Sequence, residues 1–200
     1  MKRLRQIDTL NMFESLLNHI ARFVKLSADE QQVLSDHLSV KKVRKKEFLL
    51  KEGDICTANY FIVKGCLRMY FIKENGQEQI VAFGIDYWWI TDYTSLETHK
   101  PSLYYIQAVE NSEVIILTKT QRDNLFDRIP MIERYFRILL QRLQGASVTR
   151  LKYLFELSAE EKYHNMNNHF PEFIQRVPQY MLASYLGITP EVLSKIRAKK

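Results

Sequence analysis

The spacing of apolar residues along the chain changes period twice. From about residue 43 to residue 118, short apolar runs rich in β-branched and aromatic residues alternate with turn-forming residues, which predicts β-strands. After residue 118, apolar residues recur every three or four positions, as they do on one face of a helix. Before the strands, Ser27-x-x-Glu30 has the capping-box pattern that begins a short helix over residues 27–38. The predicted fold class is therefore α+β.

The strand region contains several short runs at near-regular spacing. Turn signals lie between the runs, and Asn75-Gly76 is the strongest hairpin signal because both of its residues would adopt positive φ. Such spacing indicates a sandwich or barrel, and a small β jelly roll fits the length. The clearest runs are Tyr60–Val63, Cys66–Ile72, Gln79–Phe83 and Val114–Leu117.

A long helix is predicted from Pro130 to Leu157. Proline is tolerated in a first helical turn, and the apolar positions that follow have heptad-like spacing. The stripe slips near Gly145 and resumes at Leu151 and Leu154. It either lies on the strand domain or forms a seam between two copies, and its length favours the seam. The predicted dimer-interface residues are Ile132, Phe136, Leu139, Leu143 and Ala146.

A second capping box, Ser158-x-x-Glu161, marks a new helix and a domain boundary before it. Three parts are therefore predicted. They are a β-roll domain over residues 1–127, a long helix over 128–157 that is the candidate dimer seam, and a helical domain over 158–200.

The last part of the chain has the pattern of two short helices joined by a tight turn. Ala183 is a small residue where the helices would cross, and Gly187 four residues later permits the turn. Thr189 is a natural N-cap, and Pro190 falls at the first position of the second helix. These features predict a DNA-binding helix-turn-helix, and the alternative is an ordinary helical hairpin.

The charge agrees with a polyanionic partner, since 29 Lys and Arg outnumber 23 Asp and Glu. We expect Glu191 to accept from cytosine, Lys195 to donate to guanine, and the terminal lysines to contact phosphates. Pro190 offers apolar surface only. A second basic cluster, over residues 41–46, fits a solvated edge strand. The predicted DNA-binding residues are Gln179, Thr189, Pro190, Glu191, Ser194, Lys195, Arg197, Lys199 and Lys200.

Composition excludes several classes of protein. A hydrophobic content of 46% is sufficient for a packed core, and no apolar stretch approaches the ~20 residues of a membrane span. The basic N-terminal head is followed by interrupted apolar residues, so a cytoplasmic protein without a membrane partner is expected. In that compartment Cys56 and Cys66 are expected to be free, half-buried thiols.

An enzyme is the first rival interpretation, because rolls of this type also house metal-dependent oxygenases and isomerases. His99 is the one histidine in the strand region, no HxH is present, and no nucleophile or phosphate-loop motif occurs. We therefore expect no catalytic residues, no metal site and no enzymatic activity.

From about residue 20 to residue 200, the chain resembles the Crp/Fnr superfamily of bacterial transcription regulators. Three features in order carry the resemblance. Gly53-Asp54 with Tyr60–Gly65 resembles the cyclic-nucleotide-binding β roll, Pro130–Leu157 resembles the dimerisation helix, and Gln179–Arg197 resembles the DNA-binding helix pair. The resemblance implies a winged-helix-type DNA-binding domain and a homodimer on two-fold related double-stranded DNA, with RNA polymerase as a candidate partner.

The chain departs from the cyclic-AMP-binding members of that superfamily. They carry a Gly-Glu-Leu segment and, some ten residues later, an Arg-Ser or Arg-Thr pair that holds the phosphate. The corresponding stretches here are Gly84–Ile90 and Lys100–Tyr105, and no arginine lies between Arg68 and Arg122. A desolvated phosphate needs a charged partner, so cyclic AMP is not expected as a cofactor and any other effector is unidentified.

Aromatic residues take the place of the missing polar groups. They either line a pocket for a flat or apolar effector or fill the roll, and the filled core is favoured. The candidate pocket residues are Trp88, Trp89, Tyr93, Ser102 and Tyr104.

The DNA-reading segment departs too. Pro190 and Lys195 replace the arginines of many members, so the target site is expected to differ from the best-known one. A strand is an open alternative at 173–177. The remaining rival is a ligand-sensing or protein-interaction module with a degenerate DNA-binding domain, which salt dependence of DNA binding distinguishes.

Overall fold

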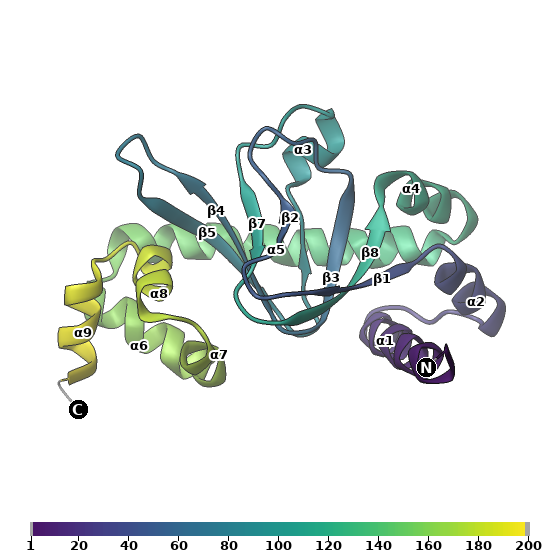
Figure 1. The fold of residues 1–200 in the computed structure, drawn as a ribbon, viewed down its shortest axis with the longest axis horizontal. Helices are drawn as coiled ribbons and strands as arrows, with labels where there is room; N and C mark the ends of the chain where they lie inside the picture. The colour runs from purple at the N-terminus through teal and green to yellow at the C-terminus, as the bar shows by residue number, and fades with distance from the viewer. Residues whose placement is uncertain (1, 199–200) are drawn as a thin grey trace. The chain divides into compact units, whose positions relative to one another are not determined.

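The computed structural model describes residues 2–198, with side chains from residue 11 onward. The predicted order of a strand region followed by helices is confirmed (Figure 1). In chain order the elements are α1 (Lys2–Ala21), α2 (Ala28–Asp36), β1 (Ser39–Val43), β2 (Phe48–Leu50), β3 (Ala58–Lys64), β4 (Cys66–Ile72), β5 (Glu78–Ile85), β6 (Trp89–Ile90), α3 (Tyr93–Thr98), β7 (Tyr105–Ala108), β8 (Ser112–Thr118), α4 (Lys119–Arg128), α5 (Pro130–Glu156), α6 (Ala159–His169), α7 (Pro171–Arg176), α8 (Gln179–Leu186) and α9 (Pro190–Ala198).

The chain divides into two compact units. The first holds residues up to Met69 together with Phe83–Leu140, and the second holds Tyr70–Ala82 together with the described residues from Gln141 onward. The hairpin β4–β5 and the helix α5 each contribute to both units. The boundaries that the sequence predicts at residues 127 and 157 stay predictions.

The β-roll consists of two four-stranded sheets, ordered β1-β8-β3-β6 and β2-β7-β4-β5. The strands β1, β3 and β8 pair antiparallel, with Val40 opposite Ile115 and Phe61 opposite the same residue from the other side. Because successive side chains alternate between the two faces of a strand, β3 serves two cores. Tyr60 and Ile62 belong to one apolar cluster, and Phe61 belongs to the other.

The cluster that contains Ile62 is made entirely by the roll and α3. Its members include Leu67, Leu96 and Ile106, all fully buried, with Tyr93 packed against them. This cluster supports the expectation that apolar side chains fill the roll.

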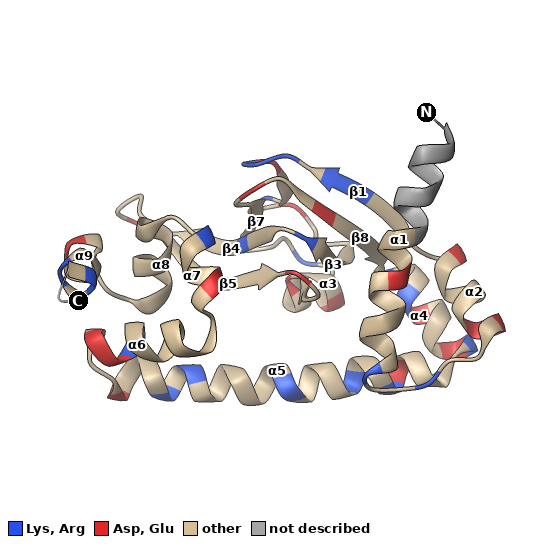
Figure 2. Ribbon diagram, turned by 90° about the horizontal axis from the view of Figure 1, so that it is seen from below, with Lys and Arg blue, Asp and Glu red and all other residues tan. Residues whose placement is uncertain are grey.

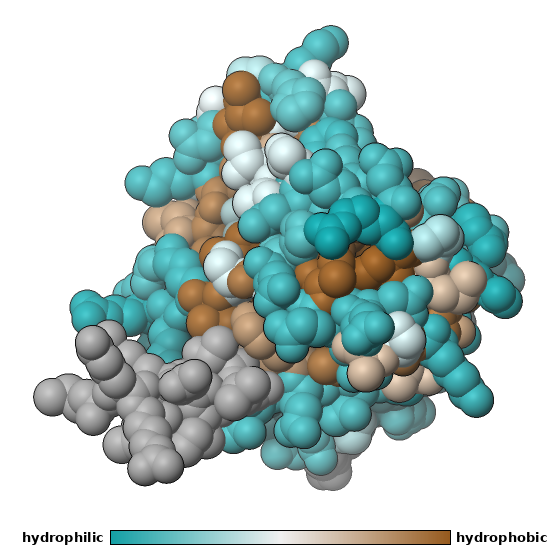
Figure 3. All heavy atoms as spheres, turned by 90° about the vertical axis from the view of Figure 1, so that its right-hand side faces the viewer, coloured by the Kyte–Doolittle hydropathy of each residue, from teal (hydrophilic) through white to brown (hydrophobic). Residues whose placement is uncertain are grey.

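The cluster that contains Phe61 joins the roll to helices α1, α4 and α5. Leu16, Leu125 and Ile132 are buried in it, as is Phe136. Figure 3 shows the face on the side of α1, α2 and α4, where patches of apolar surface lie between hydrophilic side chains. None of the described helices combines the length and the apolar character needed to cross a membrane.

The turn between β4 and β5 differs from the expectation in its geometry. Gly76 has a φ of 79°, but Asn75 is not among the described residues with positive φ, so the prediction of a turn with two positive-φ residues is wrong. The loop is longer, because Lys73 N–H donates to the Gln77 carbonyl at 2.9 Å and Gly76 N–H donates to the Lys73 carbonyl at 2.8 Å.

Both predicted capping boxes are confirmed. Ser27 pairs with Glu30, and Ser158 pairs with Glu161, each pair exchanging side-chain and backbone hydrogen bonds at a helix start. A third box, between Thr118 and Gln121 at the start of α4, was not predicted.

The C-terminal part of the second unit is helical. Residues 171–176 form α7, so a strand over 173–177 is wrong there; Pro171 at the first position starts the helix instead. Among the described residues from 157 to 198 there are helices α6 to α9 and no strand.

Candidate nucleic-acid interface

Helices α8 and α9 form the predicted helix-turn-helix. α8 ends at Leu186, and Gly187 follows in the left-handed conformation with a φ of 69°. Ile188 N–H then donates to the Ala183 carbonyl at 3.0 Å, so the turn satisfies a carbonyl at the end of the helix. Ala183 is completely buried, as expected for a small residue where two helices approach.

Thr189 caps the second helix, as the sequence predicts. Its hydroxyl accepts from Val192 N–H at 3.3 Å, and Pro190 is the first residue of α9. Leu193 and Ile196 are buried, so they fix the rotation of α9 about its axis.

The outer face of α9 is exposed and carries both signs of charge (Figure 2). Glu191, Ser194 and Lys195 lie on it at helical spacing, with Arg197 beside them. A hydrogen bond with the Thr189 side chain lowers the pKa of Glu191, and the charge of Lys195 acts in the same direction. The Glu191 carboxylate is therefore an ionised acceptor at neutral pH.

The remaining predicted DNA contacts have different positions. Gln179 is exposed at the first position of α8, where Pro178 provides no side-chain cap. Lys199 and Lys200 lie outside the described residues.

A small apolar core holds α8 and α9 in place. α6, α7 and α8 contribute Tyr163, Phe173 and Leu182 to it, and each of them is buried. The helix-turn-helix is therefore a folded domain surface, with its charged side turned to solvent.

The long helix α5 presents a different apolar stripe from the one predicted. Ile132 and Phe136 are buried in the first unit, and Leu139 packs partly against the same cluster. Leu143 is 53% exposed, and Ala146 is exposed as well. The first turns of the helix thus serve the core of the β-roll unit, which leaves Leu143 and Ala146 free at its surface.

Three apolar side chains that were not predicted, Leu140, Val148 and Phe155, extend the exposed stripe of α5. The signal was the slip near Gly145, after which the phase of the stripe changes. At 3.6 residues per turn, the exposed stripe spans an arc of about 140° and is turned by roughly a quarter of a revolution from the predicted one. Its members are Leu140, Leu143, Val148, Leu151 and Phe155.

The predicted effector-pocket residues do not share one environment. Trp88 is 43% exposed, whereas Trp89 packs on Phe61 and Phe136 in the cluster beside α5. Tyr93 packs in the cluster inside the roll, and burial raises its pKa to about 12. Tyr104 is half-buried, with its backbone N–H bonded to the Ser102 hydroxyl.

Ser102 belongs to a buried polar network around the start of α3. The Asp92 carboxylate accepts from Thr94 N–H at 3.0 Å, from Ser95 N–H at 3.2 Å and from the Ser102 hydroxyl at 2.7 Å. Ser95 in turn accepts from Cys56 N–H at 2.9 Å. Asp92 and Ser102, ten residues apart, therefore satisfy each other.

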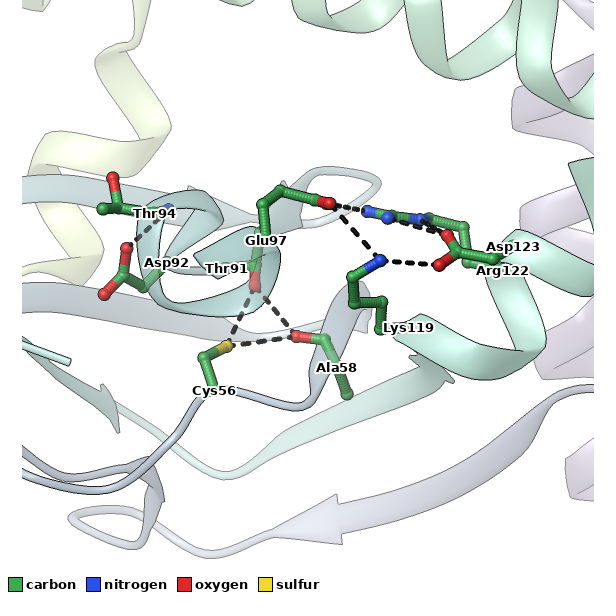
Figure 4. Close-up of polar contacts among 9 residues, drawn as sticks. All are labelled: Cys56, Ala58, Thr91, Asp92, Thr94, Glu97, Lys119, Arg122 and Asp123. Atoms are coloured by element: carbon green, nitrogen blue, oxygen red, sulfur yellow. Dashed lines mark hydrogen bonds and ion pairs between the residues drawn. The ribbon is translucent and has the colours of Figure 1, made fainter. Parts of the chain in front are cut away.

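Figure 4 shows the Asp92–Thr94 bond and two further sets of contacts near α3. The Cys56 thiol lies 3.2 Å from the Thr91 hydroxyl. Cys56 and Cys66 are both fully buried rather than half-buried as predicted. On the other side of α3, the Arg122 guanidinium forms an ion pair with the Glu97 carboxylate at 2.7 Å. This hydrogen-bonded pair lowers the pKa of Glu97.

The same cluster ties α3 to α4. Lys119 lies 3.4 Å from Glu97 and 2.6 Å from Asp123, and Asp123 also binds Arg122 at 2.9 Å (Figure 4). Arg122, the first arginine after Arg68, is thus held by two carboxylates. Arg68 donates twice to the Gln107 side chain, at 2.7 and 3.0 Å.

The chain is similar to known proteins in its β-roll and over most of its length. Residues 40–128 match the cyclic nucleotide-binding domain. The regulatory protein HlyX of Actinobacillus pleuropneumoniae is 26% identical over 185 residues, covering 86% of this chain and 75% of HlyX. The fumarate nitrate reduction regulatory protein of Klebsiella oxytoca is 27% identical over 171 residues, covering 78% of this chain and 66% of that protein.

Among solved structures, FixK2 from Bradyrhizobium japonicum has the same fold. Its TM-score is 0.67 at 17% identity, with 81% of this chain and 83% of FixK2 covered. HlyX and the Klebsiella oxytoca protein are both named as regulatory proteins. In sequence and in fold, the chain is thus similar to regulators of the Crp/Fnr type.

Proposed function

We propose that the chain is a homodimeric DNA-binding regulator whose β-roll does not bind cyclic AMP. The observation that carries the proposal is the exposed outer face of α9, which offers an ionised acceptor at Glu191 and cations at Lys195 and Arg197. Helices of a helix-turn-helix read base edges in the major groove with such residues. The relatives named as regulators support a regulatory rather than an enzymatic role, and DNA as a partner supports a cytoplasmic location.

The exposed stripe on α5 supports the homodimer. Phe155 is 89% exposed and Leu151 is 53% exposed, and the other members of the stripe are exposed as well. Fully burying one such side chain contributes roughly 1.5–3 kcal/mol, so a second copy of the stripe is a favourable partner. We place the seam on Leu140, Leu143, Val148, Leu151 and Phe155 rather than on Ile132 and Phe136, because those two are already buried.

The network around α3 supports the absence of cyclic AMP. A cyclic phosphate in the roll would need a cation, but Arg122 is held by Glu97 and Asp123. A phosphate placed at Ser102 would also lie near the buried Asp92 carboxylate that Ser102 contacts, and bringing two anions together out of water is unfavourable. Apolar side chains inside the roll add to this obstacle.

Three measurements test the proposal. DNA affinity should fall steeply as salt rises. Lys195→Ala should lower the affinity, and Lys199→Ala, at an expected phosphate contact, should reduce the salt slope by about one. DNA binding that is indifferent to salt would favour the module with a degenerate helix-turn-helix. Titration calorimetry should detect no binding of cyclic AMP or cyclic GMP, and micromolar binding would overturn that part. RNA polymerase remains a proposed partner, to be tested by a supershift of the protein–DNA complex.

A further inference from the structure

The hairpin β4–β5 contacts the first helix of the helix-turn-helix. β5 is the end strand of its sheet, so one edge of it has no strand partner. On α8, Ser184 takes the place of a strand: its hydroxyl accepts from Ile80 N–H at 3.0 Å and donates to the Glu78 carbonyl at 2.9 Å. The Gln79 side chain donates to the Ser184 carbonyl at 2.6 Å.

Arg150 on α5 joins the same contact from another element. Its guanidinium donates to the Val81 carbonyl at 2.6 Å and to the Tyr185 carbonyl at 3.2 Å, and it stacks 4.0 Å from the Tyr185 ring centroid. The carbonyls of Ser184 and Tyr185 belong to the last turn of α8, where carbonyls lack partners within the helix and attract cations. The hairpin and Arg150 thus complete the C-terminal end of α8.

All of these contacts lie within the second unit, which contains residues 70–82, the later part of α5, and α8. None of them touches the exposed outer face of α9 that carries Glu191 and Lys195. The contact therefore fixes α8 and leaves the outer face of α9 exposed.

We propose that Arg150 and Ser184 are positioning residues for DNA binding: they latch α8 to the hairpin and to α5. This inference rests on the proposed function. A dimer binds two half-sites only while both copies of α9 are held at the required spacing. Without the contacts of α8, a fraction of the molecules would hold α9 in other positions. The apparent affinity falls in proportion to the fraction of molecules in the competent arrangement.

The test uses the full-length protein and a fluorescent duplex recovered with the wild type from a random-sequence library. Ser184→Ala and Arg150→Ala should each weaken binding roughly 5- to 30-fold, as expected when one or two hydrogen bonds are lost. The salt slope should stay unchanged, because neither residue is placed on a phosphate. Ser184→Thr keeps the hydroxyl and should restore affinity, and Thr149→Ala is the control beside Arg150 on α5.

Hydrogen exchange supplies a second readout that needs no DNA. The Ile80 amide should be protected in the wild type and exchange faster in Ser184→Ala. Wild-type affinity in both variants with unchanged Ile80 exchange would overturn the latch, and so would a salt slope that falls in Arg150→Ala. If the wild type recovers no duplex, the proposed function fails, while Ile80 exchange still decides whether the latch exists.

Discussion

Replacing Tyr135 by phenylalanine removes one hydroxyl from the junction between the β-roll and the long helix. That hydroxyl is buried, accepts from the Trp89 indole N–H at 2.8 Å and lies 2.7 Å from His19 Nδ1. Burial lowers the pKa of His19 to about 4, with the charge of Arg22 as a lesser cause, so the imidazole is neutral at pH 7. Its Nδ1 is therefore free to accept from the tyrosine hydroxyl.

The magnitude follows from the groups left behind. Tyr135→Phe keeps the ring, which packs edge-on against Phe23 and Phe136, so the apolar contacts change little. The indole N–H and the imidazole nitrogen lose their partner in a part-buried environment. Leaving such groups unsatisfied costs about 1–3 kcal/mol of unfolding free energy.

Denaturant unfolding followed by tryptophan fluorescence measures this cost. Both tryptophans, Trp88 and Trp89, belong to the first unit, so the signal reports that unit. Tyr87→Phe, at an exposed tyrosine of the same unit, is the matched control and should change stability by less than about 0.5 kcal/mol. Protein concentration is held fixed because a dimer is expected. A Tyr135→Phe protein as stable as the control would refute the role given to the hydroxyl.

Three further changes test other parts of the account. In denaturant unfolding, Gly65→Ala should destabilise the roll by more than about 2 kcal/mol, because the φ of Gly65 is +121° and the new Cβ would lie 2.7 Å from the Ser112 Cα. Gly53→Ala is the control and should cost less, because no atom lies within 4 Å of its new Cβ. The contribution of His19 to the free energy of unfolding should be complete above pH 6.5 and should be lost toward pH 4, because His19 takes up a proton more readily in the unfolded chain. The loss should be about 1–2 kcal/mol after a discount for partial exposure. A His19→Gln protein with the same pH profile as the wild type would contradict this. Leu151→Glu should raise the dimer dissociation constant at least about 100-fold in sedimentation experiments, and an intact dimer would count against the seam on α5.

The helix-turn-helix could be predicted from sequence because its determinants are local. Steric and hydrogen-bonding requirements of neighbours within a few residues explain each of its key positions, which are Ala183, Gly187, Thr189 and Pro190. The capping box at Ser158 is local in the same sense. Signals of this kind survive without knowledge of the tertiary structure.

The apolar stripe of α5 was less predictable. A heptad pattern predicts that one face of a helix will be buried. It does not tell whether the β-roll or a second copy of the chain buries that face. The first turns, with Ile132 and Phe136, pack on the β-roll and only the later turns remain exposed. The turn at Asn75-Gly76 failed for a related reason, since a longer loop places only Gly76 at positive φ.

The contacts around α8 could not be predicted at all from local pattern. Ser184 and Ile80 are 104 residues apart, and a serine in a helix carries no signal for a strand edge. The same holds for Asp92 and Ser102, whose mutual hydrogen bond depends on the path of the chain around α3. Tertiary structure decides such contacts, and sequence spacing alone does not.

Selection of bound duplexes from a random-sequence library tests the central claim most directly. Two copies of α9 held by paired α5 helices should enrich an inverted repeat whose half-sites lie about one helical turn, or ~34 Å, apart. Enrichment of a lone half-site without symmetry, or of no sequence at all, would contradict a homodimer that reads DNA through α9.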